Sequence, residues 1–191
     1  MSEHVAVSVT YLGGKADSYT LNFSRPASGV YVQYYKFLRY GLFGYDRACH
    51  VMMKNAQYIR DGLRAMTKDG QPLFTMLDDG DKNCLPVVTA MLNPELNLPY
   101  DDIDLQHAIA RYHWYVSGYR MNYHHPVTDE RKPLFGNMST DQSMFRVVIK
   151  NNLTRNMADH LLQAFSKALV DLDENRHLNP ISQTLQVRPS H

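Results

Sequence analysis

Histidine and cysteine side chains are the residues of this sequence that could bind a metal ion. Four of the nine histidines could be assembled into a metal site: His107, His113, His124 and His125. His124 and His125 are adjacent and would point to opposite sides of a strand. No His-x-x-x-His spacing supports a site, and Cys49 and Cys84 lie too far apart for a Cys-x-x-Cys pair. The pattern therefore does not predict a metal site.

Arg146 is a charged residue inside an apolar segment, Met144-Phe-Arg-Val-Val-Ile149. Strand alternation gives this segment two largely apolar faces, which predicts a strand covered on both sides. An arginine there must find a partner or a water-filled pocket, because an unpaired buried charge is costly. Its guanidinium is a planar fork of donors that suits a carboxylate. The alternative, an arginine on the solvent face of an edge strand, stays open.

Tyrosines cluster near the start of the chain and could form a binding site: Tyr31, Tyr34, Tyr35, Tyr40 and Tyr45. A tyrosine can also bury its ring while its hydroxyl reaches water. This amphipathic chemistry favours the second interpretation, an amphipathic interface or core.

Composition places the chain among globular proteins. Its 191 residues are 44% apolar and 20% charged, which predicts one domain. Twenty basic and nineteen acidic residues give a net charge of +1, so no electrostatic footprint for nucleic acid or an anionic membrane exists. The start lacks the pattern of a signal peptide, and no apolar run approaches the ~18 residues of a membrane span. Two cysteines suit a reducing compartment, and we expect a cytoplasmic protein.

Local patterns predict the elements that position these residues. Strands are expected over 5–12, 18–23, 72–77, 85–92, 114–123 and 144–149. Helices are expected over 30–40, 45–66, from the acidic cap at 101–104 to Tyr112, and after a cap at Thr154. The segment 124–140 contains Pro126 and Pro133 and is predicted to be a mobile loop. The order of elements predicts a sheet covered by helices on one face.

Several motifs near the start of the chain occur in a characteristic order. They are Tyr11-Leu-Gly-Gly14, Thr20-Leu-Asn-Phe-Ser-Arg-Pro26, Gln33-Tyr-Tyr-Lys-Phe-Leu-Arg39 and Gly44-Tyr45. Further matches follow in register at Leu85-Pro-Val-Val88, Phe145-Arg-Val-Val-Ile-Lys150, Ala158-Asp159 and Leu161-Leu162. In these motifs the chain resembles the group II pyridoxal-phosphate-dependent decarboxylases, and among them the glutamate decarboxylases. The resemblance covers nearly the whole chain but only the C-terminal part of such an enzyme.

The resemblance implies an α/β fold, more narrowly an α+β small domain of the fold-type I pyridoxal-phosphate-dependent architecture. Its small, mostly antiparallel sheet would carry helices on one face and follow a long linking helix. Residues 1–70 would then be a remnant of the large domain with the linking helices. Residues 71–178 would form the C-terminal small domain, and residues 179–191 a flexible tail.

Two residues match positions that bind ligands in the family. Ser24 matches a loop that helps to bind the cofactor phosphate of the neighbouring subunit, and a hydroxyl at a turn before a helix suits a phosphate. The alternative is that Ser24 only caps the helix or the turn. Arg146 matches the strand arginine that holds the substrate carboxylate. The resemblance thus implies pyridoxal phosphate as the cofactor and a small anionic amino acid as the substrate.

The family's Schiff-base lysine lies in a Ser-x-His-Lys segment upstream of the Tyr-Leu-Gly-Gly motif. The lysines of this sequence are Lys15, Lys36, Lys54, Lys68, Lys82, Lys132, Lys150 and Lys167, and none follows Ser-x-His. Because the cofactor performs the chemistry in such enzymes, we expect a truncated carboxy-lyase with no catalytic residue of its own, inactive alone. It would need a homo-oligomer, such as the family's dimer, or a partner chain carrying the large domain. The alternatives are a non-catalytic regulatory partner of full-length decarboxylases and a cofactor-independent enzyme of specialised metabolism.

Overall fold

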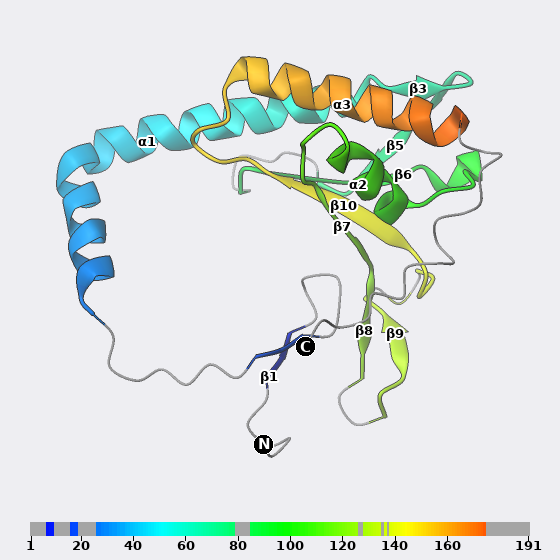
Figure 1. Ribbon diagram of the computed structural model, residues 1–191, viewed down its shortest axis with the longest axis horizontal. Coiled ribbons are helices and arrows are strands. Elements are labelled where there is room, and N and C mark those ends of the chain that lie inside the picture. The colour runs from blue at the N-terminus through cyan, green and yellow to red at the C-terminus, as the bar shows by residue number, and fades with distance from the viewer. Residues whose placement is uncertain are drawn as a thin grey trace.

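The computed structural model describes residues 7–9, 16–18, 26–78, 85–125, 128–134, 136 and 138–174. A four-stranded antiparallel sheet forms the centre of this part of the chain, and helices lie along one side of it (Figure 1). None of the described helices is long and apolar enough to cross a membrane.

The central sheet has the strand order β5-β6-β10-β7. Its strands are β5 (Phe74–Met76), β6 (Val87–Leu92), β10 (Ser143–Val148) and β7 (Ser117–Arg120). Three hairpins accompany it, and the short 3-10 helix η2 (Pro94–Leu96) follows β6. The hairpins pair β1 (Val7–Val9) with β2 (Ala16–Ser18), β3 (Thr67–Lys68) with β4 (Gln71–Pro72), and β8 (Asn122–His124) with β9 (Arg131–Pro133).

The core lies between this sheet and helices α1 (Ser28–Arg64), α2 (Asp102–Ala110) and α3 (Arg155–Glu174). Alternation places Val88, Ala90, Phe145 and Val147 on the helix side, where all four are buried. Phe165 of α3 contacts Phe145, with ring centroids 5.3 Å apart. The expected sheet with helices on one face is therefore present.

The other face of the central sheet carries no described helix. Met144 is buried there, Arg146 is half-buried, and Val148 is 53% exposed. The prediction that strand 144–149 is covered on both sides is therefore wrong for the described residues. We call this surface the open face; it includes Thr89 and Tyr119 beside the β10 residues.

Helix α1 is two helical stretches joined at Gly41, whose φ of 56° and ψ of −172° are not helical. A positive φ costs glycine little, which explains the kink at this residue. The two helices expected over 30–40 and 45–66 are thus confirmed. The stretch before the kink, residues 28–40, turns away from the rest of the structure and is exposed throughout (Figure 1). We call it the arm.

Helix caps behave as the sequence predicts. Asp101 accepts hydrogen bonds from the backbone N–H groups of Ile103 and Asp104, and the Asp104 side chain accepts the N–H of Asp101. Thr154 accepts the N–H of Met157 before α3. The predicted mobile loop over 124–140 is wrong in part, because strand β9 within it pairs with β8. Of the strand expected over 18–23, all but the first residue lies outside the described residues. The tail over 179–191 lies outside them entirely.

Candidate functional site

Arg146 occupies the middle of β10, which is an inner strand of the sheet. Its register partners are Thr89 on β6 and Ser117 on β7. Because cross-strand partners share a face, all three side chains belong to the open face. The alternative that the sequence left open, an arginine on the solvent face of an edge strand, is wrong about the strand, because β10 is an inner strand and Arg146 lies half-buried on the open face.

The Arg146 guanidinium lacks a hydrogen-bond partner at one of its donors. Its Cζ lies 5.6 Å from the centre of the Tyr119 ring. Its Nε is buried and donates no hydrogen bond within the described structure. A buried donor left unsatisfied costs about 1–3 kcal/mol, so a carboxylate that accepted from this guanidinium would be bound favourably. The open face thus presents a charged fork suited to a carboxylate.

Ser24, the predicted phosphate-binding residue, lies outside the described residues. The N-cap position of α1 is occupied by Ala27, and no side chain caps the helix there. Its predicted role toward a cofactor phosphate stays a prediction.

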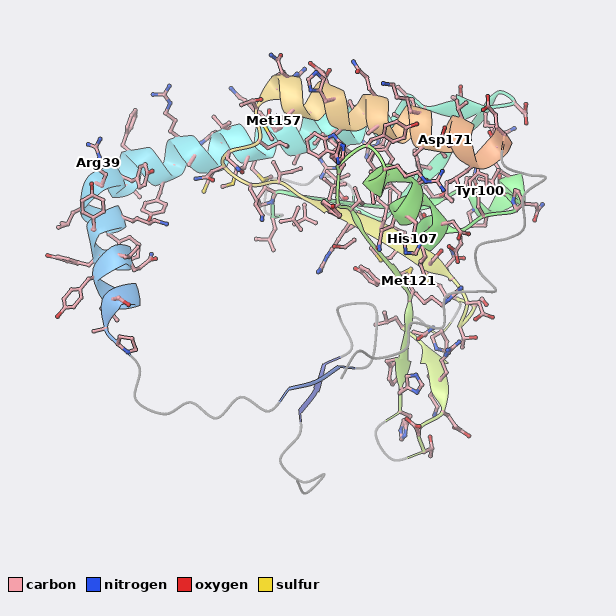
Figure 2. The ribbon with its side chains drawn as sticks, viewed as in Figure 1. Arg39, Tyr100, His107, Met121, Met157 and Asp171 are labelled. Atoms are coloured by element: carbon pink, nitrogen blue, oxygen red, sulfur yellow. The ribbon has the colours of Figure 1, made fainter. Side chains whose placement is uncertain are left out.

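Of the four histidines considered as metal ligands, His113 and His125 lie outside the helices and strands. His107 is in the last turn of α2, and His124 on β8 lies 3.3 Å from the carboxylate of Asp129. The described side chains form no group of three or more potential metal ligands. The predicted tyrosine interface is only partly in contact: the ring of Tyr45 contacts Tyr40 and Phe37, and Tyr31, Tyr34 and Tyr35 are exposed on the arm. Arg39, on the same stretch, lies far from the sheet (Figure 2).

Two buried polar clusters were missed from the sequence. Arg60 on α1 is 1% exposed and donates to the Asp78 carboxylate from Nε at 2.6 Å. Asp78 in turn accepts the backbone N–H and the hydroxyl of Thr89. Asp102 on α2 is likewise buried and accepts from Ser143 and from the N–H of Leu92. Charged residues such as Arg60, Asp78 and Asp102 are expected at the surface. The one sequence signal for burial is that Arg60 falls among the apolar positions of its helix.

A pocket of about 310 Å³ opens beside the Asp102 cluster. Its polar lining includes Asn93, Asn97, Asp101, Asp141 and Gln142. Arg146 does not line it, since that residue lies on the open face. The carboxylate site that the sequence predicts and this pocket are thus different places in the fold.

Comparisons with known proteins agree with the resemblance in the sequence. No family model matches the chain. A probable glutamate decarboxylase gamma of Listeria innocua is 32% identical over 170 residues, which is 89% of this chain and 32% of that protein. The glutamate decarboxylase of Petunia hybrida is 28% identical over 165 residues, 86% of this chain and 28% of that protein.

Solved structures give the same relationship. Glutamate decarboxylase of Lactobacillus brevis superposes with a TM-score of 0.62 and 25% identity over 91% of this chain and 35% of that one. A sphingosine-1-phosphate lyase of Burkholderia pseudomallei shares the fold, with a TM-score of 0.53 and 14% identity. The chain spans about a third of the length of the curated relatives it matches. It is therefore a glutamate-decarboxylase-like chain with a small α+β fold, and it corresponds to the C-terminal part of a group II pyridoxal-phosphate-dependent decarboxylase.

Proposed function

We propose that this chain contributes the carboxylate-binding half of a pyridoxal-phosphate-dependent carboxy-lyase that acts on glutamate or a similar anionic amino acid. Arg146 binds a carboxylate of the substrate. The observation that carries this proposal is the Arg146 guanidinium on the open face, with its buried Nε unpartnered among the described residues. In this proposal, residues 71–178 form the small domain, residues 1–70 link it to a large domain, and the protein works in the cytoplasm.

The cofactor is assigned to residues other than those of the central sheet. Ser24 binds the cofactor phosphate, and it lies outside the described residues. No lysine of this sequence follows Ser-x-His, so the Schiff-base lysine comes from elsewhere. Bound pyridoxal phosphate serves as an electron sink in such enzymes. The contribution of this chain is to hold and orient the carboxylate.

The arm supports a partner for this chain. Large apolar side chains are exposed along it and just past the kink: Val30, Tyr31, Val32, Tyr34, Tyr35, Phe37, Leu38, Tyr40, Leu42 and Phe43. Monomers rarely expose an apolar surface larger than a few hundred Å². A second copy or a chain that carries the large domain would cover it. The same observation favours a second candidate function, a non-catalytic partner of full-length decarboxylases.

Ligand-dependent thermal unfolding tests the assignment of Arg146. Glutamate and glutarate should raise the melting temperature of the chain, and Arg146→Ala should abolish that rise. Arg146→Lys should restore little of it, because an ammonium does not reproduce the bidentate fork. Arg131→Ala is the matched control, since it removes a half-exposed guanidinium from β9. An equal rise in the wild type and in Arg146→Ala would refute the proposal.

A further inference from the structure

Tyr119 and Arg146 are diagonal neighbours on the open face. Tyr119 pairs in register with Met144, two residues before Arg146 on β10. Such diagonal positions lie within reach of aromatic and long side chains. The Arg146 Cζ lies 5.6 Å from the Tyr119 ring centre, inside the range of a cation–π interaction.

Arg60 on α1 and Arg146 on β10 are held in different ways. The donors of Arg60 are occupied by the Asp78 carboxylate, by Gln57 and by the carbonyl of Val87. Arg146 instead contacts an aromatic ring, and its Nε donates to no described acceptor. A ring attracts the cation through its π-system and accepts none of the in-plane N–H groups. Tyr119 can therefore restrain the guanidinium and leave its donors for a ligand.

We infer that Tyr119 is a positioning residue, whose ring holds the Arg146 guanidinium so that its N–H edge faces a carboxylate ligand. The identity of that ligand rests on the proposed function, whereas the ring-to-guanidinium contact does not. The aromatic ring carries this role, and the hydroxyl does not. A phenylalanine at position 119 therefore preserves the role, and an aliphatic residue of similar bulk does not.

Nuclear magnetic resonance of the arginine side chain tests the contact directly. A ring beside the guanidinium shifts the Arg146 Nε–H resonance, assigned by its loss in Arg146→Lys. We expect Tyr119→Phe to keep that shift, and Tyr119→Leu and Tyr119→Ala to move the resonance toward the position of a solvated arginine. An unchanged resonance in Tyr119→Leu, in a variant that keeps the wild-type fold by circular dichroism, would overturn the inference.

Binding of glutarate, measured by calorimetry, tests the consequence. Loss of a cation–π contact should weaken glutarate binding by about three- to tenfold in Tyr119→Leu and Tyr119→Ala. Tyr119→Phe should bind as the wild type does. Tyr115→Ala is the control, because Tyr115 is 87% exposed and precedes the same strand. Equal weakening by Tyr119→Phe would assign the effect to the hydroxyl and overturn the inference.

Failure of this inference and failure of the proposed function give different results. If Arg146→Ala leaves glutarate binding intact, the proposed carboxylate site is wrong, and the Nε–H resonance still decides the role of Tyr119. If Arg146→Ala abolishes binding and Tyr119→Ala does not weaken it, Arg146 binds the ligand without help from the ring. That second result refutes the role of Tyr119 alone.

Discussion

Ser143 on β10 donates a hydrogen bond of 2.7 Å from its hydroxyl to the carboxylate of Asp102 on α2. The same hydroxyl accepts the backbone N–H of Asp102 at 3.2 Å, so the two residues bind each other reciprocally. The other carboxylate oxygen of Asp102 accepts the N–H of Leu92 on β6 at 2.8 Å. One buried side chain thereby joins α2 to both inner strands of the sheet.

Burial raises the pKa of Asp102 to about 6, against the lowering effect of its bonds to Ser143 and Leu92. The nearby Asp101 carboxylate raises it further. Because the folded state holds this proton more tightly than the unfolded state, the group stabilises the fold most below about pH 4. That contribution is lost as the pH rises through about 6. A pKa shift of this size corresponds to roughly 3 kcal/mol in the free energy of unfolding.

We therefore expect Asp102→Asn to change how stability depends on pH. An asparagine can accept the N–H of Leu92 with its side-chain oxygen and donate from its side-chain NH₂ to the Ser143 hydroxyl, and it carries no charge to bury. Relative to the wild type, the variant should gain roughly 3 kcal/mol between pH 4 and pH 7.5, measured by urea unfolding. The exposed Asp141, replaced by Asn, is the control and should show a much smaller change. A constant difference between Asp102→Asn and wild type across this range contradicts the prediction.

The ion pair between the buried Arg60 and the partly buried Asp78 gives a second stability prediction. Arg60→Met leaves the Asp78 carboxylate with Thr89 as its partner and should cost about 3 kcal/mol. The double variant Arg60→Met with Asp78→Asn should lose less than the sum of the two single changes, because it leaves no unpaired charge. Urea unfolding of the four proteins measures this coupling. Strict additivity would show that the pair acts as two independent groups.

The sequence predicts what depends on local patterns. Alternation locates β6 and β10, and the acidic cap locates the start of α2. Contacts between residues that are distant in the sequence leave no such local signal. Arg60 meets Asp78 eighteen positions away, and Asp102 meets Ser143 forty-one positions away. A charged residue predicts exposure by default, so nothing in the sequence indicates the Asp102 cluster, and the one signal for Arg60 is its position among apolar residues of its helix.

The strand of Arg146 and its ligand are indicated by different features of the sequence. Apolar alternation indicates its strand, the guanidinium itself suits a carboxylate, and the resemblance to decarboxylases implies that this carboxylate belongs to a substrate. The prediction of a strand covered on both sides failed because side-chain polarity does not tell which apolar face has a neighbour. The open face became visible only with the register of β10 between β6 and β7.

A third prediction concerns turnover. With pyridoxal phosphate and glutamate, we expect the purified chain to release no carbon dioxide above the buffer blank. The reason is that no lysine of this sequence follows the Ser-x-His pattern of the family. A full-length glutamate decarboxylase assayed in parallel is the positive control. Carbon dioxide release together with borohydride trapping of the cofactor at one specific lysine of this chain would disprove it.

The last prediction concerns the arm, whose two sides differ in chemistry. Gln33, Lys36 and Arg39 recur at a spacing of three residues and form one polar stripe. The remaining surface carries tyrosines, Phe37 and Leu38, all exposed. Because water does not favour so wide an apolar face on a free helix, we expect the chain to self-associate in light scattering and to bind an apolar dye. Phe37→Glu with Leu38→Glu should reduce both signals, and Lys36→Glu with Arg39→Glu, on the polar stripe, should leave the dye signal intact. A monomer without dye binding at high micromolar concentration would show that the arm needs no cover.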